Sequence, residues 1–300
     1  MTVSNPFPGH IKKIAIAAPA GPCPETDFSK AREIIESFGI SVVTTPNAFK
    51  GTKEKYFSAG LHQRLDDIHY CWSDTSIDLV LCARGGYGSA KLLPLLDWEL
   101  LRSRPLPLVG LSDITALHLG MLSRGVSSAV SSCVAKNFCG MLEDDFSIRH
   151  MKKALHHEKN ETVLMPYGRE IKIIRNGAAA GPAILANLTV MASLCGTEFM
   201  PDLSGAILFV EDINEPPYKI DRCLNQLQMS GVIGRLSALV FSSFDECGPE
   251  EDLVHIFESY AAELSGPVLS NFPFGHSRPC FSYTQGRRIA IKEGGIIYTE

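Results

Sequence analysis

The amino-acid sequence predicts an α/β protein with a mostly parallel sheet in its N-terminal part and a second, smaller α/β domain after it. Its 300 residues favour two domains of about 150 residues, and a hydrophobic content of 45% is enough for two cores. Short β-branched runs alternate with helix-like patterns, as in sheets covered by helices. Charged residues make up only 20% of the chain. Disordered, collagen-like and coiled-coil proteins are therefore excluded.

The N-terminal half shows a strand-helix-strand rhythm. Each strand is predicted from a short apolar run and each helix from helical spacing of apolar residues, with Gly39 ending the first helix. The predicted elements are strands at 13–18, 40–45, 77–83, 107–110 and 126–131, and helices at 28–38, 61–72, 89–96 and 113–122. Such alternation predicts parallel strands with helices on both faces.

The segment 147–175 differs in texture, because histidine and lysine are frequent and apolar residues are few before 162–165. We interpret it as a polar linker that contains His150, His156 and His157. The expected domains are therefore 1–146 and 176–300.

The C-terminal half repeats the alternation on a smaller scale. The predicted elements are strands at 171–174, 206–210, 236–241 and 267–270, helices at 186–194, 220–229 and 250–264, and a closing hairpin of 288–291 and 295–298. The hairpin is predicted from the Glu293-Gly294 turn between its strands.

Charge and cysteine content narrow the class of function. A net charge of −5 gives no electrostatic basis for binding nucleic acid or an anionic membrane. No apolar run reaches the roughly 20 residues of a membrane span, and the N-terminus lacks the pattern of a secretory signal. Nine cysteines, with no CxxC and no zinc spacing, are expected to be mostly buried free thiols in a cytoplasmic protein.

Two loops follow neighbouring strands of the predicted parallel sheet, at the edge where α/β proteins bind ligands. One is the glycine-rich segment 84–89, and the other is the strand-to-helix turn at Ser112 and Asp113. Hydrolases expose a nucleophilic serine on such a turn. Ile114 replaces the second glycine of G-x-S-x-G, so a helix-capping role for Ser112 or Asp113 stays open.

The glycine-rich segment has three interpretations. It lacks G-K-[ST] and the third glycine of a dinucleotide fingerprint, which counts against phosphate binding. The second interpretation is a sharp turn that binds no ligand. In the third, Gly86 supplies an oxyanion N–H opposite the Ser112 turn, which requires close approach of the backbone.

A serine nucleophile needs a histidine base and a group that orients it. Among the histidines, His276 lies in a loop after the strand 267–270, where functional residues tend to occur. Glu211 directly follows the strand 206–210, at another carboxyl end. The alternatives are an ordinary loop histidine for His276, and either a solvated loop acid or a salt-bridge partner of Arg222 for Glu211.

Five ordered segments resemble signature blocks of the LD-carboxypeptidases, a family of serine peptidases that includes muramoyl-tetrapeptide carboxypeptidase and the microcin C self-immunity peptidase. The segments are IAIAAPAGP, RGGYGSAKLLPLLDW, LVGLSDITALH, ILFVEDINEPPYKIDRCLNQL and PVLSNFPFGHSRP. The resemblance implies a Rossmann-like N-terminal domain, a smaller C-terminal domain, a site at their junction and a homodimer.

The same resemblance implies roles for individual residues. Ser112 is the nucleophile, Glu211 the orienting acid and His276 the general base, with Gly86 and Asp113 N–H groups as the oxyanion hole. Gly85 and Asn187 are expected to bind substrate. Arg84, beside the glycines, is a candidate partner of the terminal carboxylate on charge grounds rather than from the resemblance, and it is equally interpretable as a structural ion pair. The family usually has Gly-Gly-Asn-Leu where this chain has Leu185-Ala186-Asn187-Leu188, which puts the shape of that side of the cleft in doubt.

The implied activity is hydrolysis, without metal or organic cofactor, of the amide between an L-centre and a terminal D-amino acid, as in release of D-Ala from a cytoplasmic murein tetrapeptide. Alternatives are a peptidase for microcin-type peptidyl nucleotides, a broad serine esterase, and a non-catalytic protein that binds a small anion on the same scaffold.

Overall fold

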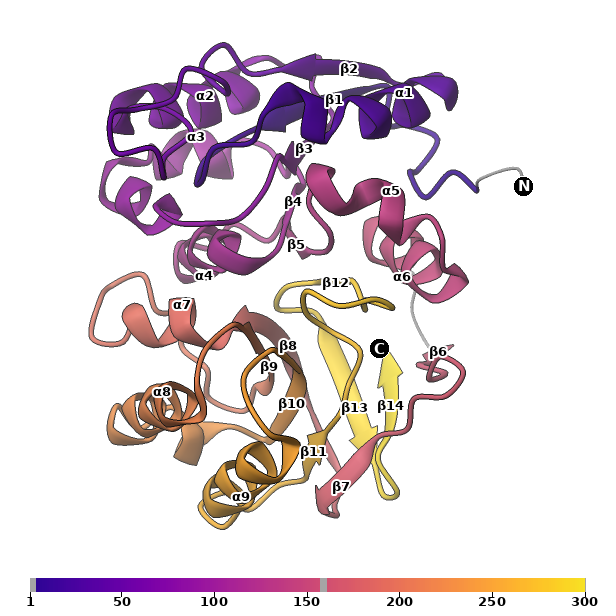
Figure 1. Ribbon diagram of the computed structural model, residues 1–300, viewed down its shortest axis with the longest axis vertical. Helices are drawn as coiled ribbons and strands as arrows, with labels where there is room; N and C mark the ends of the chain where they lie inside the picture. The colour runs from indigo at the N-terminus through magenta and orange to yellow at the C-terminus, as the bar shows by residue number, and fades with distance from the viewer. Residues whose placement is uncertain (1–3, 157–160, 300) are drawn as a thin grey trace.

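The computed structural model describes residues 4–156 and 161–299. Figure 1 shows two lobes, each a sheet flanked by helices, stacked along the long axis of the molecule. The N-terminal lobe is built on a six-stranded sheet and the C-terminal lobe on an eight-stranded one. The predicted fold class, a mostly parallel α/β domain followed by a second α/β domain, is confirmed.

The N-terminal sheet has the strand order β12-β5-β4-β3-β1-β2. Its first five strands in sequence are β1 Lys13–Ala17, β2 Ser41–Thr44, β3 Leu79–Cys82, β4 Leu108–Gly110 and β5 Ala129–Ser131. They pair in parallel, as predicted. The sixth, β12 Tyr283–Thr284, runs antiparallel to β5 and comes from the C-terminal end of the chain. The sequence analysis missed this return to the first sheet.

Three of the four helices predicted for this lobe are α-helices, at 29–37, 61–73 and 115–123, and the lobe has three further α-helices that the pattern did not predict. The α-helices are α1 Ser29–Ser37, α2 Leu61–Ser73, α3 Trp98–Arg102, α4 Thr115–Ser123, α5 Phe138–Met141 and α6 Asp145–His156. The predicted helix at 89–96 is the 3₁₀ helix η2 Ser89–Leu95, which contains Pro94. Short 3₁₀ helices also occur at η1 Glu25–Asp27, η3 Ser112–Ile114 and η4 Ala135–Asn137.

The predicted polar linker is wrong over its first part, which is the amphipathic helix α6. Its buried residues are Phe146, Ser147, His150, Met151, Ala154 and Leu155, which recur at helical spacing. Of the lysines that suggested a linker, Lys152 is exposed and Lys153 is half-buried on this helix. Two strands lie within the rest of the segment, β6 Glu161–Thr162 and β7 Lys172–Arg175. His157 lies outside the described residues.

The C-terminal sheet has the order β6-β14-β13-β8-β9-β10-β11-β7. Its central strands β8 Ala179–Asn187, β9 Ile207–Ile213, β10 Ala238–Asp245 and β11 Val268–Ser270 are parallel. The hairpin β13 Arg288–Lys292 and β14 Ile296–Thr299 is antiparallel, as predicted. The helices are α7 Leu188–Ser193, α8 Pro217–Met229 and α9 Glu250–Ala261, with η5 Ile233–Arg235.

Strand β8 corrects the prediction of a helix from residue 186. The strand continues to Asn187, and only then does α7 begin. Gly181 and Pro182 concealed this strand, since both residues are unfavourable inside strands. A Cβ on Gly181 would lie 2.0 Å from the carbonyl oxygen of Gly205. The glycine is therefore required by a close approach of backbone.

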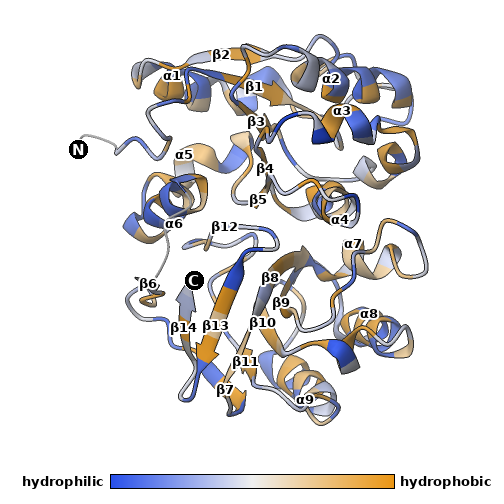
Figure 2. Ribbon diagram, turned by 180° about the vertical axis from the view of Figure 1, so that it is seen from behind, coloured by the Kyte–Doolittle hydropathy of each residue, from blue (hydrophilic) through white to orange (hydrophobic). Residues whose placement is uncertain are grey.

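The two lobes share a core. One cluster of buried apolar residues extends from Ala15 and Leu117 in the first lobe to Met191 and Val210 in the second, and α4 contacts α7. Figure 2 shows strands that are largely hydrophobic and helices with both hydrophobic and hydrophilic sides. The carboxyl ends of β4 and β9 are held by this shared packing.

The described residues also show the state of the cysteines, the character of the helices and the grouping of possible metal ligands. All nine cysteines are free, and six of them are buried. No described helix has the length and apolar character needed to cross a lipid bilayer. Within residues 4–156 and 161–299, no group of three or more His, Cys, Asp or Glu side chains is arranged to hold a metal ion.

Candidate active site

Ser112 lies on a strained turn between β4 and α4. Its φ is +66°, a conformation that non-glycine residues seldom adopt and that clusters at functional sites. Gly110 makes the turn possible, because a Cβ there would lie 2.8 Å from the Ile114 side chain. The Ser112 side chain remains partly exposed. The strand-to-helix turn predicted for a nucleophile is present.

The glycine-rich loop after β3 packs directly against this turn. A Cβ on Gly85 would lie 2.7 Å from Ser112 Cβ and 2.9 Å from Ser112 Oγ. Gly86 has φ +108°, and a Cβ there would lie 3.1 Å from Gly21 Cα. The Gly21 N–H donates to the Gly85 carbonyl at 3.0 Å. The loop is thus fixed against Ser112 by backbone contacts that leave no room for side chains.

Two backbone N–H groups beside Ser112 are free. Within the part of the chain that the structure describes, neither the Gly86 N–H nor the Asp113 N–H donates to a protein acceptor. Asp113 is buried, and its Oδ2 accepts a hydrogen bond from the Ser89 N–H at 2.8 Å. Its side chain therefore holds the 84–89 loop to the Ser112 turn. An N–H pair at a helix start suits an anionic oxygen.

Arg84 is half-buried beside the same glycines. Its Nη1 donates to the Pro22 carbonyl at 3.1 Å, and its Nε would lie 3.6 Å from a Cβ on Gly21. No ion pair of Arg84 occurs among the described residues. The structural ion pair considered from sequence is not present in this part of the chain.

Glu211 and His276 form the second half of the site. His276 Nδ1 lies 2.7 Å from Glu211 Oε2, and Glu211 is fully buried. Glu211 lies inside β9 rather than after a strand, since β9 runs on to Ile213. The alternative pairing with Arg222 is wrong, because the Arg222 guanidinium lies over the Tyr218 ring.

Burial and charge shift both partners of this pair. Burial raises the pKa of Glu211, opposed by the hydrogen bond from His276. For His276, burial alone would lower the pKa, but the hydrogen bond to Glu211 and its negative charge outweigh burial and raise it. An imidazole held in this way by a buried carboxylate is suited to accept a proton at its other nitrogen.

A polar network behind Glu211 includes residues that sequence analysis missed. Asn187 Nδ2 donates to Glu211 Oε1 at 3.2 Å and to Asp212 Oδ1 at 3.0 Å. Thr189 donates to Asp212 Oδ2 from both its N–H and its hydroxyl. The Asn187 N–H donates to Thr115 Oγ1 at 3.0 Å. The adjacent acids Glu211 and Asp212 were the signal in the sequence for such a network.

The structure corrects the expected role of Asn187. Its side chain is buried, and Oδ1 accepts from the Val190 N–H as the N-cap of α7. Each polar group of that side chain is therefore used inside the protein. Asn187 positions Glu211 rather than presenting itself to a ligand.

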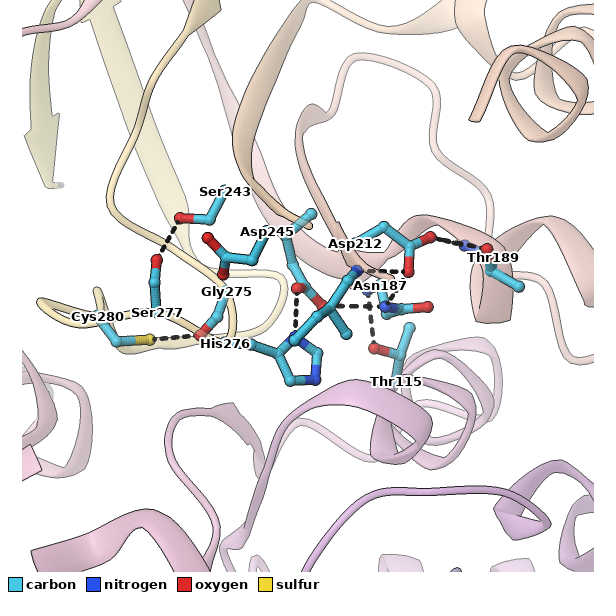
Figure 3. Close-up of polar contacts among 12 residues, drawn as sticks. Thr115, Asn187, Thr189, Asp212, Ser243, Asp245, Gly275, His276, Ser277 and Cys280 are labelled. Carbon is cyan, nitrogen blue, oxygen red and sulfur yellow. Dashed lines mark hydrogen bonds and ion pairs between the residues drawn. The ribbon is translucent and has the colours of Figure 1, made fainter. Parts of the chain in front are cut away.

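The serine and histidine halves meet at the junction of the lobes. Figure 3 shows the His276 ring directed away from the C-terminal strands and toward the ribbon of the N-terminal lobe. No hydrogen bond joins Ser112 to His276 among the described residues. Thr115, three residues after Ser112, joins the two halves through its bond with Asn187. Catalytic hydrogen bonds are often long without substrate and tighten when it binds.

A cavity of about 410 Å³ opens beside His276 and is lined by both lobes. Leu111 and Met141 come from the N-terminal lobe. Gly275 and Arg278 come from the loop 271–282 between β11 and β12, which carries His276 and is called the catalytic loop below. Pockets for small ligands typically measure 300–1,000 Å³. The volume is therefore sufficient for part of a peptide.

Two other histidines, His118 and His150, are buried in the core. His118 is buried behind β4 and contacts the Leu108 carbonyl, and burial lowers its pKa to about 4. Burial likewise lowers the pKa of His150 to about 3. His150 packs between the rings of Phe146 and Phe281. Both are neutral core side chains at physiological pH.

Comparison with known proteins identifies the family. Residues 14–131 match the LD-carboxypeptidase N-terminal domain, and residues 180–291 match the LD-carboxypeptidase C-terminal domain. The chain belongs to the LD-carboxypeptidase family. The resemblance expected from the five sequence segments is thereby confirmed.

Three relatives illustrate the range of proteins that the chain is similar to. A murein tetrapeptide carboxypeptidase of Pseudomonas aeruginosa is 32% identical over 250 residues, which cover 80% of each chain. The crystal structure of a muramoyltetrapeptide carboxypeptidase from Oxalobacter formigenes is 29% identical, with a TM-score of 0.82 over 95% of this chain and 97% of that one. The microcin C7 self-immunity protein MccF of Escherichia coli is 23% identical over 92% of this chain and 88% of its own.

Proposed function

We propose that the protein is a serine LD-carboxypeptidase that hydrolyses the amide between an L-centre and a terminal D-amino acid of a murein peptide. The observation that carries this proposal is the Glu211–His276 pair at 2.7 Å, directed at the lobe whose strained turn holds Ser112. Family membership and the murein tetrapeptide carboxypeptidases among its relatives support the substrate class.

The reaction begins with proton transfer and attack. His276 Nε2 accepts the hydroxyl proton of Ser112, while Ser112 Oγ forms a bond to the carbonyl carbon of the amide. The electron pair of the carbonyl moves onto its oxygen. The Gly86 and Asp113 N–H groups donate hydrogen bonds to this oxyanion, in line with their lack of protein acceptors.

Collapse of the tetrahedral species releases the terminal amino acid. The carbon–nitrogen bond breaks, and the departing amine takes the proton from His276. Water then attacks the Ser112 ester by the same route and frees the shortened peptide. Glu211 keeps Nδ1 protonated and stabilises the imidazolium, and Asn187 fixes the Glu211 carboxylate from its other oxygen.

Substrate recognition uses groups at the rim of the site. Arg84 offers a guanidinium beside the oxyanion glycines and pairs with the terminal carboxylate of the substrate. Gly85 lets the 84–89 loop pack against Ser112. We further propose a cytoplasmic enzyme, since nine free cysteines favour a reducing compartment. The family resemblance supports a homodimer.

A peptidase for microcin-type peptidyl nucleotides is the second candidate, favoured by the similarity to MccF. The two candidates differ in the group beyond the scissile bond. Cleavage of a peptidyl nucleotide without trimming of a murein tetrapeptide would favour the second candidate.

The direct test is mass spectrometry of a murein tetrapeptide incubated with the wild-type protein and with Ser112→Ala. We expect loss of the terminal D-Ala with the wild type and an intact peptide with the variant, because loss of a nucleophile leaves only residual catalysis. An intact peptide in both samples would contradict the proposal and favour a binding protein. Faster turnover of simple activated esters would favour a broad esterase.

A further inference from the structure

A second cavity lies behind the catalytic loop, at the carboxyl ends of β10 and β11. Its volume is about 360 Å³, and it is lined by charged residues that the proposed mechanism does not use. Arg169 and Asp245 both line it, and Leu253 and Phe257 of α9 supply an apolar wall. Small-ligand sites commonly combine an apolar wall with a few convergent polar groups.

A β-bulge shapes this cavity. Phe241 pairs with Val210 and Phe244 with Asp212, so β10 carries one more residue than β9 between these pairs. Bulges turn side chains out of a ladder and occur next to functional sites. Ser242 and Ser243 lie in the bulge and line the cavity.

Buried polar atoms of this cavity lack partners. Ser242 is only 6% exposed, yet its Oγ has no hydrogen-bond partner within the described residues. The buried Oδ2 atom of Asp245 also has no hydrogen-bond partner there. A buried polar atom without a partner costs roughly 1–3 kcal/mol. An ordered water or a bound ligand that supplies the missing hydrogen bond is one explanation of such an atom.

Arg169 provides the opposite charge. Its Nε donates to Asn271 Oδ1 and its Nη2 to Ser243 Oγ, both at 3.2 Å, which fixes the guanidinium. Its Nη1 donates to no acceptor in the described part of the chain. Burial lowers the pKa of Arg169, and the charge of Asp245 acts in the other direction. The charges of Arg169 and Asp245 therefore interact, but no ion pair joins these side chains within residues 4–156 and 161–299.

A cation and an anion that face one cavity without pairing are complementary to a ligand with both charges. The geometry points to a binding site for a free α-amino acid, with its carboxylate on Arg169 and its ammonium group on Asp245. Ser242 Oγ adds a hydrogen bond, and the side chain of the ligand packs on Leu253 and Phe257. The choice of D-alanine as ligand rests on the proposed function, which releases that amino acid.

The site lies against the catalytic loop without including its reactive groups. Ser277 Oγ donates to Ser243 Oγ at 3.0 Å, and a Cβ on Gly275 would lie 3.0 Å from Ser243 Cβ. Figure 3 shows Asp245 and Ser243 on the side of the loop away from the His276 ring. Neither Glu211 nor His276 lines this cavity.

Isothermal titration calorimetry with D-alanine tests the proposal on the intact protein. We expect one bound D-alanine per chain that Glu211→Gln retains, with binding at least tenfold weaker in Arg169→Gln and in Asp245→Asn. Asp245→Asn is nearly isosteric and keeps the test valid if Arg169→Gln fails to fold. Arg175→Gln and Asp252→Asn, exposed charges nearby on β7 and α9, are matched controls that should bind like the wild type.

Acetate and ethylamine, titrated separately, test the requirement for both charges and should each bind at least tenfold more weakly than D-alanine. Equal binding of acetate would overturn the proposal in favour of a simple anion site. Absence of binding would also overturn it, as would loss of binding in Glu211→Gln with retention in Asp245→Asn. Because binding is measured without turnover, failure here is distinct from failure to hydrolyse a peptide.

Discussion

The two halves of the candidate site are held by different kinds of contact. In the N-terminal lobe, Ser112 is fixed by its own strained backbone and by glycines packed against it. In the C-terminal lobe, Glu211 and His276 are fixed by a chain of buried side-chain hydrogen bonds through Asn187. The activity should therefore be sensitive to added atoms around Ser112, in what we call the nucleophile half. In what we call the relay half, formed by Glu211, His276 and Asn187, it should be sensitive to the loss of hydrogen-bond donors and charges.

The largest difference is expected from a change of one atom in the relay half. Glu211→Gln keeps the size of the side chain but removes the charge that holds His276 Nδ1 protonated. We expect kcat/KM for a murein tetrapeptide to fall by about 10³- to 10⁴-fold. Glu99→Gln, on an exposed surface pair with Arg102, is the control. A loss below tenfold would mean that the carboxylate does not orient the base.

The nucleophile half should respond instead to an added methyl group. Gly85→Ala would bring a Cβ to 2.7 Å from Ser112 Cβ, so the turn must shift. A displacement of about 1 Å at a reacting group typically costs about 100-fold in rate. We therefore expect a loss of about 100-fold in kcat, with binding of substrate less affected. Gly234→Ala, where a Cβ meets no atom within 4 Å, should be neutral. Full activity of Gly85→Ala would contradict this close packing.

A smaller effect is expected at the residue that supports the relay from behind. Asn187→Ala removes the donor shared by Glu211 and Asp212 and the N-cap of α7. We expect unfolding to become easier by about 1–3 kcal/mol and kcat to fall by roughly tenfold, as for a partly misplaced catalytic group. Chemical denaturation and steady-state kinetics measure both. Asn225→Ala, on the exposed side of α8, is the control.

A purely structural role for Asn187 would lower stability alone. The positioning role also predicts a change in the acid limb of the kcat/KM–pH profile, because the Glu211 carboxylate would lose its fixed place beside His276. An unchanged limb in Asn187→Ala would restrict this residue to stability.

The smallest expected effect is on the pH profile itself. Because the pKa of His276 is raised above its ordinary value of 6.5, kcat/KM should fall as pH drops below a midpoint above 6.5. Glu211→Gln should move this midpoint to lower pH, because burial of the ring then acts alone. The stabilising charge pair is fully present below pH 6.5 and is lost as pH rises through the folded-state pKa. A midpoint unaffected by Glu211→Gln would assign the limb to another group.

The same contrast explains what could be predicted from sequence. The Ser112 turn and its facing glycines were predictable, because strand-to-helix turns and glycines act locally and carry sequence signals. His276 and Glu211 were predictable as loop and strand-end positions, but their contact depends on the fold. The roles of Asn187 and Asp212 were not predicted, since a buried hydrogen-bond network depends on three-dimensional packing.

Errors in the predicted elements have similar physical causes. Helix α6 was interpreted as a linker because its exposed face is rich in charge, although its apolar residues recur at helical spacing. Strand β8 was missed because Gly181 and Pro182, which are unfavourable inside strands, interrupt the strand-like pattern of the sequence. Strand β12 is only two residues long, and its pairing with β5 joins segments far apart in the sequence. A local sequence pattern does not show which distant segments pair with each other.

The central claim is that Ser112 is activated by His276 across the junction of the two lobes. The most direct test is the rate at which a serine-directed phosphonate labels the protein, followed by intact-mass measurement and peptide mapping, in the wild type and in His276→Ala. We expect one label per chain, on Ser112, formed at least about 100-fold more slowly in the variant. Equal labelling rates in the two proteins, or a label on another residue, would contradict it.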